Sequence, residues 1–308
     1  MGVIVDAGFR RERESSRELA MQRIEAQRAR IDDRLGDLLD GHDEACPRLV
    51  EAMRYSLLAP GKRVRPLLAV LTALDLGRSP DALLDFGCAL ELVHCASLML
   101  DDLPCMDDAG TRRGQPAAHV KFGDATTTLA AIGLLNQAYG LLARCTAVES
   151  SVRARLVSEL SEAVGTAGLV SGQSRDLGER TRRLDGKSLD RINRQKTGVL
   201  FELAVVGAGL ILDLPQSRLA ALFNYAGHVG LAFQAADDLM DAGRMAVDSG
   251  KDCDVDVGKA GSVHQVGETA LRERLVAELS AADARLAELE LDDGLLQYFV
   301  RALFRSLL

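Results

Sequence analysis

The chain of 308 residues contains no tryptophan, and aromatic residues make up only 4% of it. Proteins that hold single-stranded nucleic acid stack its bases on aromatic side chains, so this composition argues against such a surface. The net charge of −8 points the same way, because nucleic-acid-binding domains are usually basic. We therefore expect no nucleic-acid partner.

Paired cysteines and targeting segments are also lacking. The six cysteines include no Cys-x-x-Cys pair, which argues against a zinc knuckle or a disulfide framework. No long apolar run follows a basic N-terminal segment, so we expect no secretory signal and a cytoplasmic protein. The uncharged stretch 125–143 approaches the length of a membrane span but contains threonine, asparagine, glutamine and glycine. We predict no membrane span there, but a helix buried in the core or against another subunit.

Apolar residues recur at helical spacing along most of the chain, whereas strand-like alternation and hairpin signals are missing. One apolar stripe consists of Ile24, Ile31, Leu35, Leu38 and Leu39. Further helices are expected at 152–174, 188–211, 217–241 and 268–290, and loops at 109–119, 178–187 and 242–262. The sequence therefore predicts an all-α fold of about ten helices or more.

Two acidic clusters follow apolar helical segments. The first contains Asp101, Asp102, Asp107 and Asp108, and the second contains Asp237, Asp238 and Asp241. Carboxylates at the C-terminal end of a helix are electrostatically unfavourable, so each cluster calls for a counter-charge. Oxygen ligands without histidine or cysteine suit Mg²⁺, which usually also binds substrate phosphates. We predict a magnesium site formed by both clusters.

Lysine is scarce, because only six of the 37 basic residues are Lys. Four of them lie in short motifs close to glycine or threonine: Lys62, Lys196, Lys251 and Lys259. Arginine pairs follow the same pattern in Arg63-Val64-Arg65 and in Arg112-Arg113-Gly114. Arginine binds phosphate in a bidentate manner, and lysine contributes a compact point charge. Acidic and basic motifs together favour ligands that carry diphosphate, and two such ligands.

This ordered set of motifs resembles the trans-isoprenyl diphosphate synthases over about residues 20 to 305. It comprises Gly61–Pro66, Asp101–Asp107, Arg112–Gly114, Gly172-Gln173 with Asp176, Lys196-Thr197 and Phe233–Asp241. The likeness is greatest to bacterial geranylgeranyl diphosphate synthases of the carotenoid-pathway type, especially over 93–114. It implies one polyprenyl synthase domain over 1–308, with 1–18 as a loosely ordered extension, built as a helical bundle around a central cavity.

The resemblance also implies a role for each matching residue. Three Mg²⁺ ions, replaceable by Mn²⁺, would bind the allylic diphosphate through Asp101, Asp102, Asp107, Asp237 and Asp241. The same diphosphate would contact Arg112, Lys196 and Lys251, with Gln173 and Asp176 also in the substrate site. Isopentenyl diphosphate would contact Lys62, Arg65, His94 and Arg113. Thr197 and Gln234 would line the reacting centre, and Lys259 would help to close a loop over it.

Chain length is expected to depend on Ala96 and Ser97, about one helical turn before Asp101. Small residues there, with the insertion Pro104-Cys105, are typical in this family of C20 products, so geranylgeranyl diphosphate is the favoured product. The alternatives are a C15 farnesyl diphosphate synthase and a non-catalytic, regulatory subunit. A homodimer is expected from the resemblance. Departures from the family pattern occur at Ile132 and Ala260.

Overall fold

The structure is a computed structural model that describes residues 2–40, 45–179, 186–248 and 267–308, with only the backbone at 2–16, 179, 187 and 241–248. Its elements are α1 (Gly2–Asp37), α2 (Pro47–Leu57), α3 (Val64–Asp75), α4 (Asp81–Asp101), β1 (Thr111–Arg112), β2 (Gln115–Pro116), α5 (Ala118–Phe122), α6 (Asp124–Arg144), α7 (Ser150–Val164), α8 (Leu169–Glu179), α9 (Gly186–Asn193), the π-helical turn η1 (Arg194–Gly198), α10 (Val199–Ile211), α11 (Gln216–Asp248), α12 (Glu268–Glu288) and α13 (Leu295–Phe304).

The all-α prediction is confirmed, with differences at several boundaries. The helix expected over 152–174 is interrupted at 165–168, where α7 ends and α8 begins. Of the loop expected over 242–262, residues 242–248 instead continue α11, and residues 249–262 lie outside the described part of the chain. Within the expected loop 109–119, β1 and β2 form a two-residue antiparallel ladder. Gly114 turns the chain between them with φ of 79°, a conformation that favours glycine.

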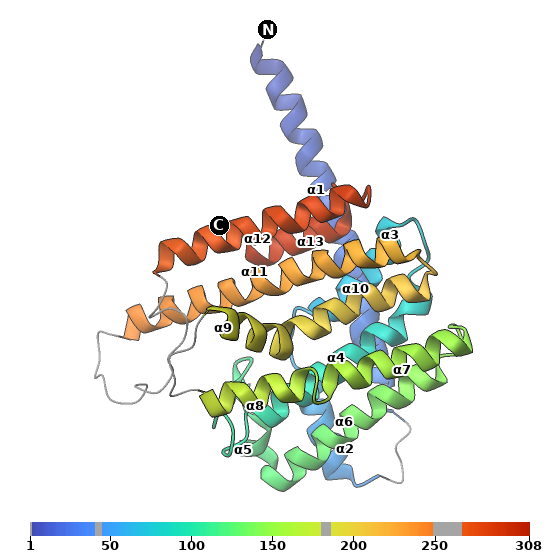
Figure 1. The fold of residues 1–308 in the computed structure, drawn as a ribbon, viewed down its shortest axis with the longest axis vertical. Coiled ribbons are helices and arrows are strands. Elements are labelled where there is room, and N and C mark those ends of the chain that lie inside the picture. The colour runs from blue at the N-terminus through green and yellow to red at the C-terminus, as the bar shows by residue number, and fades with distance from the viewer. Residues whose placement is uncertain (1, 41–44, 180–185, 249–266) are drawn as a thin grey trace.

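Helices α3, α4 and α10 form the centre of the molecule. Residues 64–73 of α3 are all buried, and α10 is buried over most of its length. Helix α4 packs against α3 and α6, and α10 packs against α3 and α11, with α12 outside α11. Figure 1 shows α12, α11, α10 and α4 in succession from top to bottom, with α6 and α2 at the end opposite α12.

Helix α1 contributes most of the predicted apolar stripe to this core, and Leu38 and Leu39 follow directly after its end. Ile24, Ile31 and Leu35 are fully buried against α3, α4 and α13, and Leu39 is 1% exposed. The N-terminal part of α1 extends away from the other helices (Figure 1). The division into one domain over 1–308, with an extension at 1–18, stays a prediction.

The candidate for a membrane span lies elsewhere than at 125–143. Among the described residues, only α4 is long and apolar enough to cross a bilayer, and 67% of its most apolar window is buried inside the protein. It therefore packs as a core helix. Residues 125–143 form most of α6, with one buried face and an exposed face that includes Leu129 and Ile132.

The end of α3 is joined to the start of α13 by a side-chain cap. The carboxylate of Asp75 accepts hydrogen bonds from the backbone N–H groups of Leu295 (2.7 Å) and Leu296 (2.8 Å). These N–H groups belong to the first turn of α13 and have no partner within that helix. Asp75 thereby fixes the C-terminal helix against the centre of the bundle.

Replacing this cap should cost stability. We expect Asp75→Ala to lower the free energy of unfolding by about 1 to 2 kcal/mol, because it leaves two helical N–H groups without their acceptor. Urea denaturation followed by circular dichroism measures the change. Asp292→Ala, at an exposed carboxylate just before α13, is the matched control. Equal stability of the two variants would contradict the capping role.

Candidate active site

The first acidic cluster lies where α4 ends and the chain turns back on itself. The backbone N–H of Asp107 donates to the carbonyl of Asp101 (2.9 Å), so the loop brings the two residues together. Burial raises the pKa of Asp101 to about 6, the positive charge of Lys196 opposes that rise, and the negative charge of Asp107 adds to it. The predicted grouping of Asp101 and Asp107 with Lys196 is therefore present.

Asp102 points to a different partner. Its side chain is 3% exposed and forms an ion pair with Arg112, whose Nε lies 3.0 Å from Oδ1. This pair connects the end of α4 to the β1–β2 hairpin. In this structure Asp102 and Arg112 neutralise each other, and their predicted roles toward metal and diphosphate stay predictions.

Basic side chains gather beside this hairpin. Arg65 is 9% exposed and its guanidinium lies 4.8 Å from the centre of the Phe201 ring. Burial lowers the pKa of Arg65 to about 10, while the charges of Glu91 and Asp237 favour its protonated form. His94 has a pKa well below 6.5 because of burial and of the positive charges of Arg65 and Arg113. The side chain of His94 is therefore a neutral imidazole within a cationic cluster.

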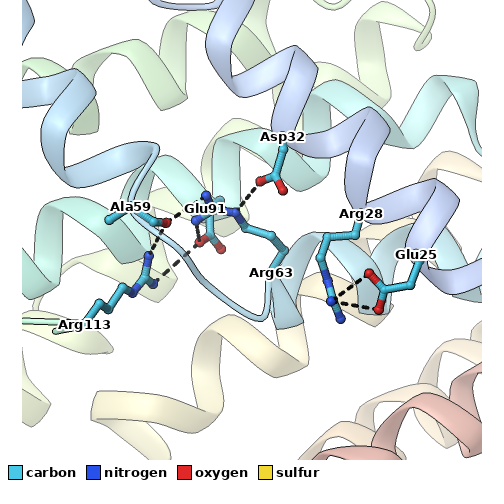
Figure 2. Close-up of polar contacts among 7 residues, drawn as sticks. All are labelled: Glu25, Arg28, Asp32, Ala59, Arg63, Glu91 and Arg113. Carbon is cyan, nitrogen blue, oxygen red and sulfur yellow. Dashed lines mark hydrogen bonds and ion pairs between the residues drawn. The ribbon is translucent and has the colours of Figure 1, made fainter. Parts of the chain in front are cut away.

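The buried carboxylate of Glu91 contacts Arg113 of this cluster and a further arginine, Arg63 (Figure 2). Arg63 Nη1 donates to Glu91 Oε1 (3.1 Å), and Arg113 Nη2 lies 3.9 Å from the same oxygen. Arg63 immediately precedes α3 in a left-handed conformation with φ of 48°, and it is 4% exposed. Of the predicted isopentenyl diphosphate ligands, the structure groups Arg65, His94 and Arg113, whereas Lys62 is exposed.

The motif around Lys196 lies in the π-helical turn η1. Such turns are rare and frequently occur at functional sites. Lys196 Nζ lies 2.7 Å from Asp176 Oδ2 of α8, so two predicted substrate-site residues are paired. Gly172 permits this approach, because a Cβ there would lie 2.5 Å from the backbone nitrogen of Lys196. Gln173 is buried, and neither polar atom of its amide has a hydrogen-bond partner. Thr197 is half-buried in the same turn.

The second acidic cluster lies on α11. Asp237 is exposed, and Asp238 is buried and accepts a hydrogen bond from Gln234 Nε2 (2.9 Å). The backbone of Asp241 continues α11, but its side chain lies outside the described residues. Lys251 and Lys259 also lie outside them. Because the charge of Asp237 acts on Arg65, this cluster lies near the basic one.

The donor chemistry of these residues fits magnesium. Asp101, Asp107 and Asp237 offer hard oxygen ligands, and the raised pKa of Asp101 marks a carboxylate that a nearby cation would stabilise in its charged form. In the parts of the chain that the structure describes, no three His, Cys, Asp or Glu side chains are grouped closely enough to hold a metal ion. The magnesium site therefore stays a prediction.

Two buried carboxylates were missed by the sequence reasoning. Glu91 in α4 and Glu202 in α10 each stand within an apolar helix and each bind an arginine. Arg194 of η1 reaches Glu202 Oε1 at 2.7 Å. A lone carboxylate in an apolar helix is a readable signal, because charged residues are almost never fully buried unless they are paired.

Comparison with known proteins agrees with these motifs. Residues 46–268 match the polyprenyl synthetase family model. The chain belongs to this family. It is 41% identical to the geranylgeranyl diphosphate synthase of Pantoea ananas over 278 residues, covering 90% of this chain and 91% of that protein. It is 36% identical to the farnesyl diphosphate synthase of Geobacillus stearothermophilus over 259 residues, covering 83% and 87% of the two chains.

A solved structure supports the fold of this polyprenyl synthetase. The crystal structure of an FPP/GFPP synthase from Zymomonas mobilis superposes with a TM-score of 0.82 and 32% sequence identity. The match covers 93% of this chain and 99% of that one. Family membership makes the chain an enzyme of the prenyltransferase type, as the sequence predicts.

The close approach at Gly172 gives a testable prediction. We expect Gly172→Ala to lower the free energy of unfolding by about 1 to 3 kcal/mol, because the added methyl would collide with the backbone of η1. Thermal denaturation measures the loss. Gly178→Ala on the same helix is the control, since a Cβ there meets no atom within 4 Å. A stable Gly172→Ala variant would show that α8 and η1 are not held this closely.

Proposed function

We propose that this chain condenses isopentenyl diphosphate with allylic diphosphates to give geranylgeranyl diphosphate and release diphosphate. The observation that carries the proposal is the presence of two charged clusters that differ in composition. One contains Asp101, Asp107 and Lys196, and the other contains Arg65 and Arg113 with neutral His94. Two diphosphates with different roles need two such sites, one able to bind metal and one that binds anions directly.

The first cluster suits the leaving group. Asp101, Asp107 and Asp237 would hold Mg²⁺, which when bound supplies positive charge that stabilises the departing diphosphate. Lys196 adds a point charge beside Asp101. Departure of the allylic diphosphate leaves a carbocation, which must be kept from water. Apolar residues of α4 and α10 would form the walls that exclude water from it.

The second cluster suits the nucleophile. Arg65 and Arg113 can bind the diphosphate of isopentenyl diphosphate with charge-assisted hydrogen bonds. Their arrangement fixes the double bond of that substrate relative to the carbocation, and attack then forms the new carbon–carbon bond. Loss of a proton completes the reaction, and the released diphosphate is the base that the family resemblance favours.

A homodimer is part of the proposal. The exposed face of α6 carries Leu129 (58% exposed) and Ile132 (54%), and the helix contains no charged residue between Asp124 and Arg144. An uncharged face with large apolar side chains suits a contact with a second copy of the chain. Ile132 would add apolar area to that contact.

A turnover assay tests the proposed function. With isopentenyl diphosphate, an allylic primer and Mg²⁺, we expect release of diphosphate and prenyl chains up to C20, and chelation of the metal should abolish both. Chromatography of the dephosphorylated products measures chain length. Products that stop at C15 would favour a farnesyl diphosphate synthase. If diphosphate is not released and the prenyl chain is not lengthened, the result would favour the hypothesis of a regulatory subunit and overturn the proposal.

Chain length gives a separate prediction. Ala96 is fully buried one turn before the acidic cluster, and the hydroxyl of Ser97 donates to the carbonyl of His94 (2.9 Å). We expect Ala96→Phe to shift the main product from C20 to C15 or shorter, because the ring would block the path of the growing chain. Ser97→Ala, which removes only an internally bonded hydroxyl, should leave the length unchanged. A C20 product from Ala96→Phe would refute this assignment.

A further inference from the structure

A buried carboxylate stands behind the basic cluster and belongs to neither acidic motif. Glu91 is 2% exposed, and its Oε1 contacts Arg63 at 3.1 Å and Arg113 at 3.9 Å. The other oxygen, Oε2, is buried and has no hydrogen-bond partner. A buried charge is costly unless it is paired, and the two arginines compensate the charge of this residue, Arg63 by a hydrogen bond and Arg113 by a longer ion pair.

The two arginines bound to Glu91 are not equivalent. Arg63 is fully engaged: it also donates to Asp32 Oδ1 (2.6 Å) and to the carbonyl of Ala59 (3.1 Å). Arg113 donates to the same carbonyl at 3.3 Å, and its side chain is 21% exposed. Figure 2 shows Arg63 reaching toward Asp32 and Glu91, and Arg113 approaching Glu91 and Ala59 from the hairpin side. Arg113 alone of the two can therefore also reach a ligand.

We infer that Glu91 is a positioning residue for the isopentenyl diphosphate site, acting by holding the Arg113 guanidinium against the Arg63–Ala59 anchor. This inference rests on the proposed function. The chain Asp32, Arg63, Glu91 and Arg113 connects α1, the start of α3, α4 and the β1–β2 hairpin. It therefore fixes a hairpin side chain to three core helices. Arg63, which lies between the predicted ligands Lys62 and Arg65, serves as part of this anchor and not as a ligand.

Glu91 could affect the site through its negative charge or through the placement of Arg113, and the two roles predict opposite effects when Glu91 is replaced. Its negative charge acts on Arg65, Arg63 and, through space, on any bound anion. If charge alone mattered, neutralising Glu91 would make the site more positive and tighten the binding of a diphosphate. If position matters, the same change frees Arg113 and weakens binding. The sign of the effect thus separates the two roles.

The experiment compares Glu91→Gln and Glu91→Asp with wild type. Binding of isopentenyl diphosphate without metal is measured by calorimetry, and KM and kcat are measured for both substrates. In both variants we expect the dissociation constant and the KM for isopentenyl diphosphate to rise about tenfold or more. A rise of this size corresponds to the loss of one charge-assisted hydrogen bond between Arg113 and the diphosphate. The KM for the allylic substrate should change little. The control is Glu278→Gln, which changes a half-buried carboxylate of α12 that is paired with His228 of α11. This variant should match wild type.

Glu91→Asp keeps the charge and shortens the reach, so it decides the matter if Glu91→Gln does not fold. Unchanged or tighter binding of isopentenyl diphosphate by the folded variants would overturn the inference. Equal losses for both substrates would also overturn it, since they would indicate general damage to the fold. Failure of wild type itself to bind isopentenyl diphosphate would instead contradict the proposed function.

Discussion

The compensation of buried charge at one region of an apolar bundle is the constraint on which this structure depends. Helices α3, α4 and α10 are apolar enough to form a dry core, yet α3 carries Arg65 and α4 carries Glu91 and Asp101. Each of these groups is costly to bury alone. Their placement among opposite charges makes the region tolerable, and the charge that remains uncompensated is what a diphosphate or a metal ion can use.

Part of the irregular backbone lies in the same region. Of the six non-glycine residues with positive φ in the described parts of the chain, Arg63, Asp108 and Arg113 lie here, and the π-helical turn η1 contains Lys196. A left-handed conformation costs a non-glycine residue about 1 to 2 kcal/mol. Strain of this kind persists only where surrounding contacts hold it, and it commonly marks ligand-binding segments. For Arg63 and Arg113 those contacts are the hydrogen bonds to Ala59 and the ion pairs with Glu91.

The helical class and most of the apolar stripe could be predicted from the sequence, because they depend on local periodicity, and the short spacings of the acidic and basic motifs indicated the family. It could not foresee that Asp102 pairs with Arg112, since that contact depends on how the hairpin folds back on α4. The π-helical turn and the burial of Arg63 were also beyond it, because both arise from tertiary packing around Gly172 and Glu91. The pairing of Glu91 and Glu202 with arginines could have been predicted, because each is a lone carboxylate in an apolar helix.

The proposed reaction requires two diphosphate sites that lie side by side and differ in their need for metal. Calorimetric titration of the wild-type protein with isopentenyl diphosphate alone and with geranyl diphosphate alone, each with Mg²⁺ and with a chelator, tests it most directly. We expect isopentenyl diphosphate to bind in both conditions, and geranyl diphosphate to bind tightly only with Mg²⁺. Tight binding of geranyl diphosphate in chelator, or binding of isopentenyl diphosphate only with metal, would show that the two sites do not differ in this way.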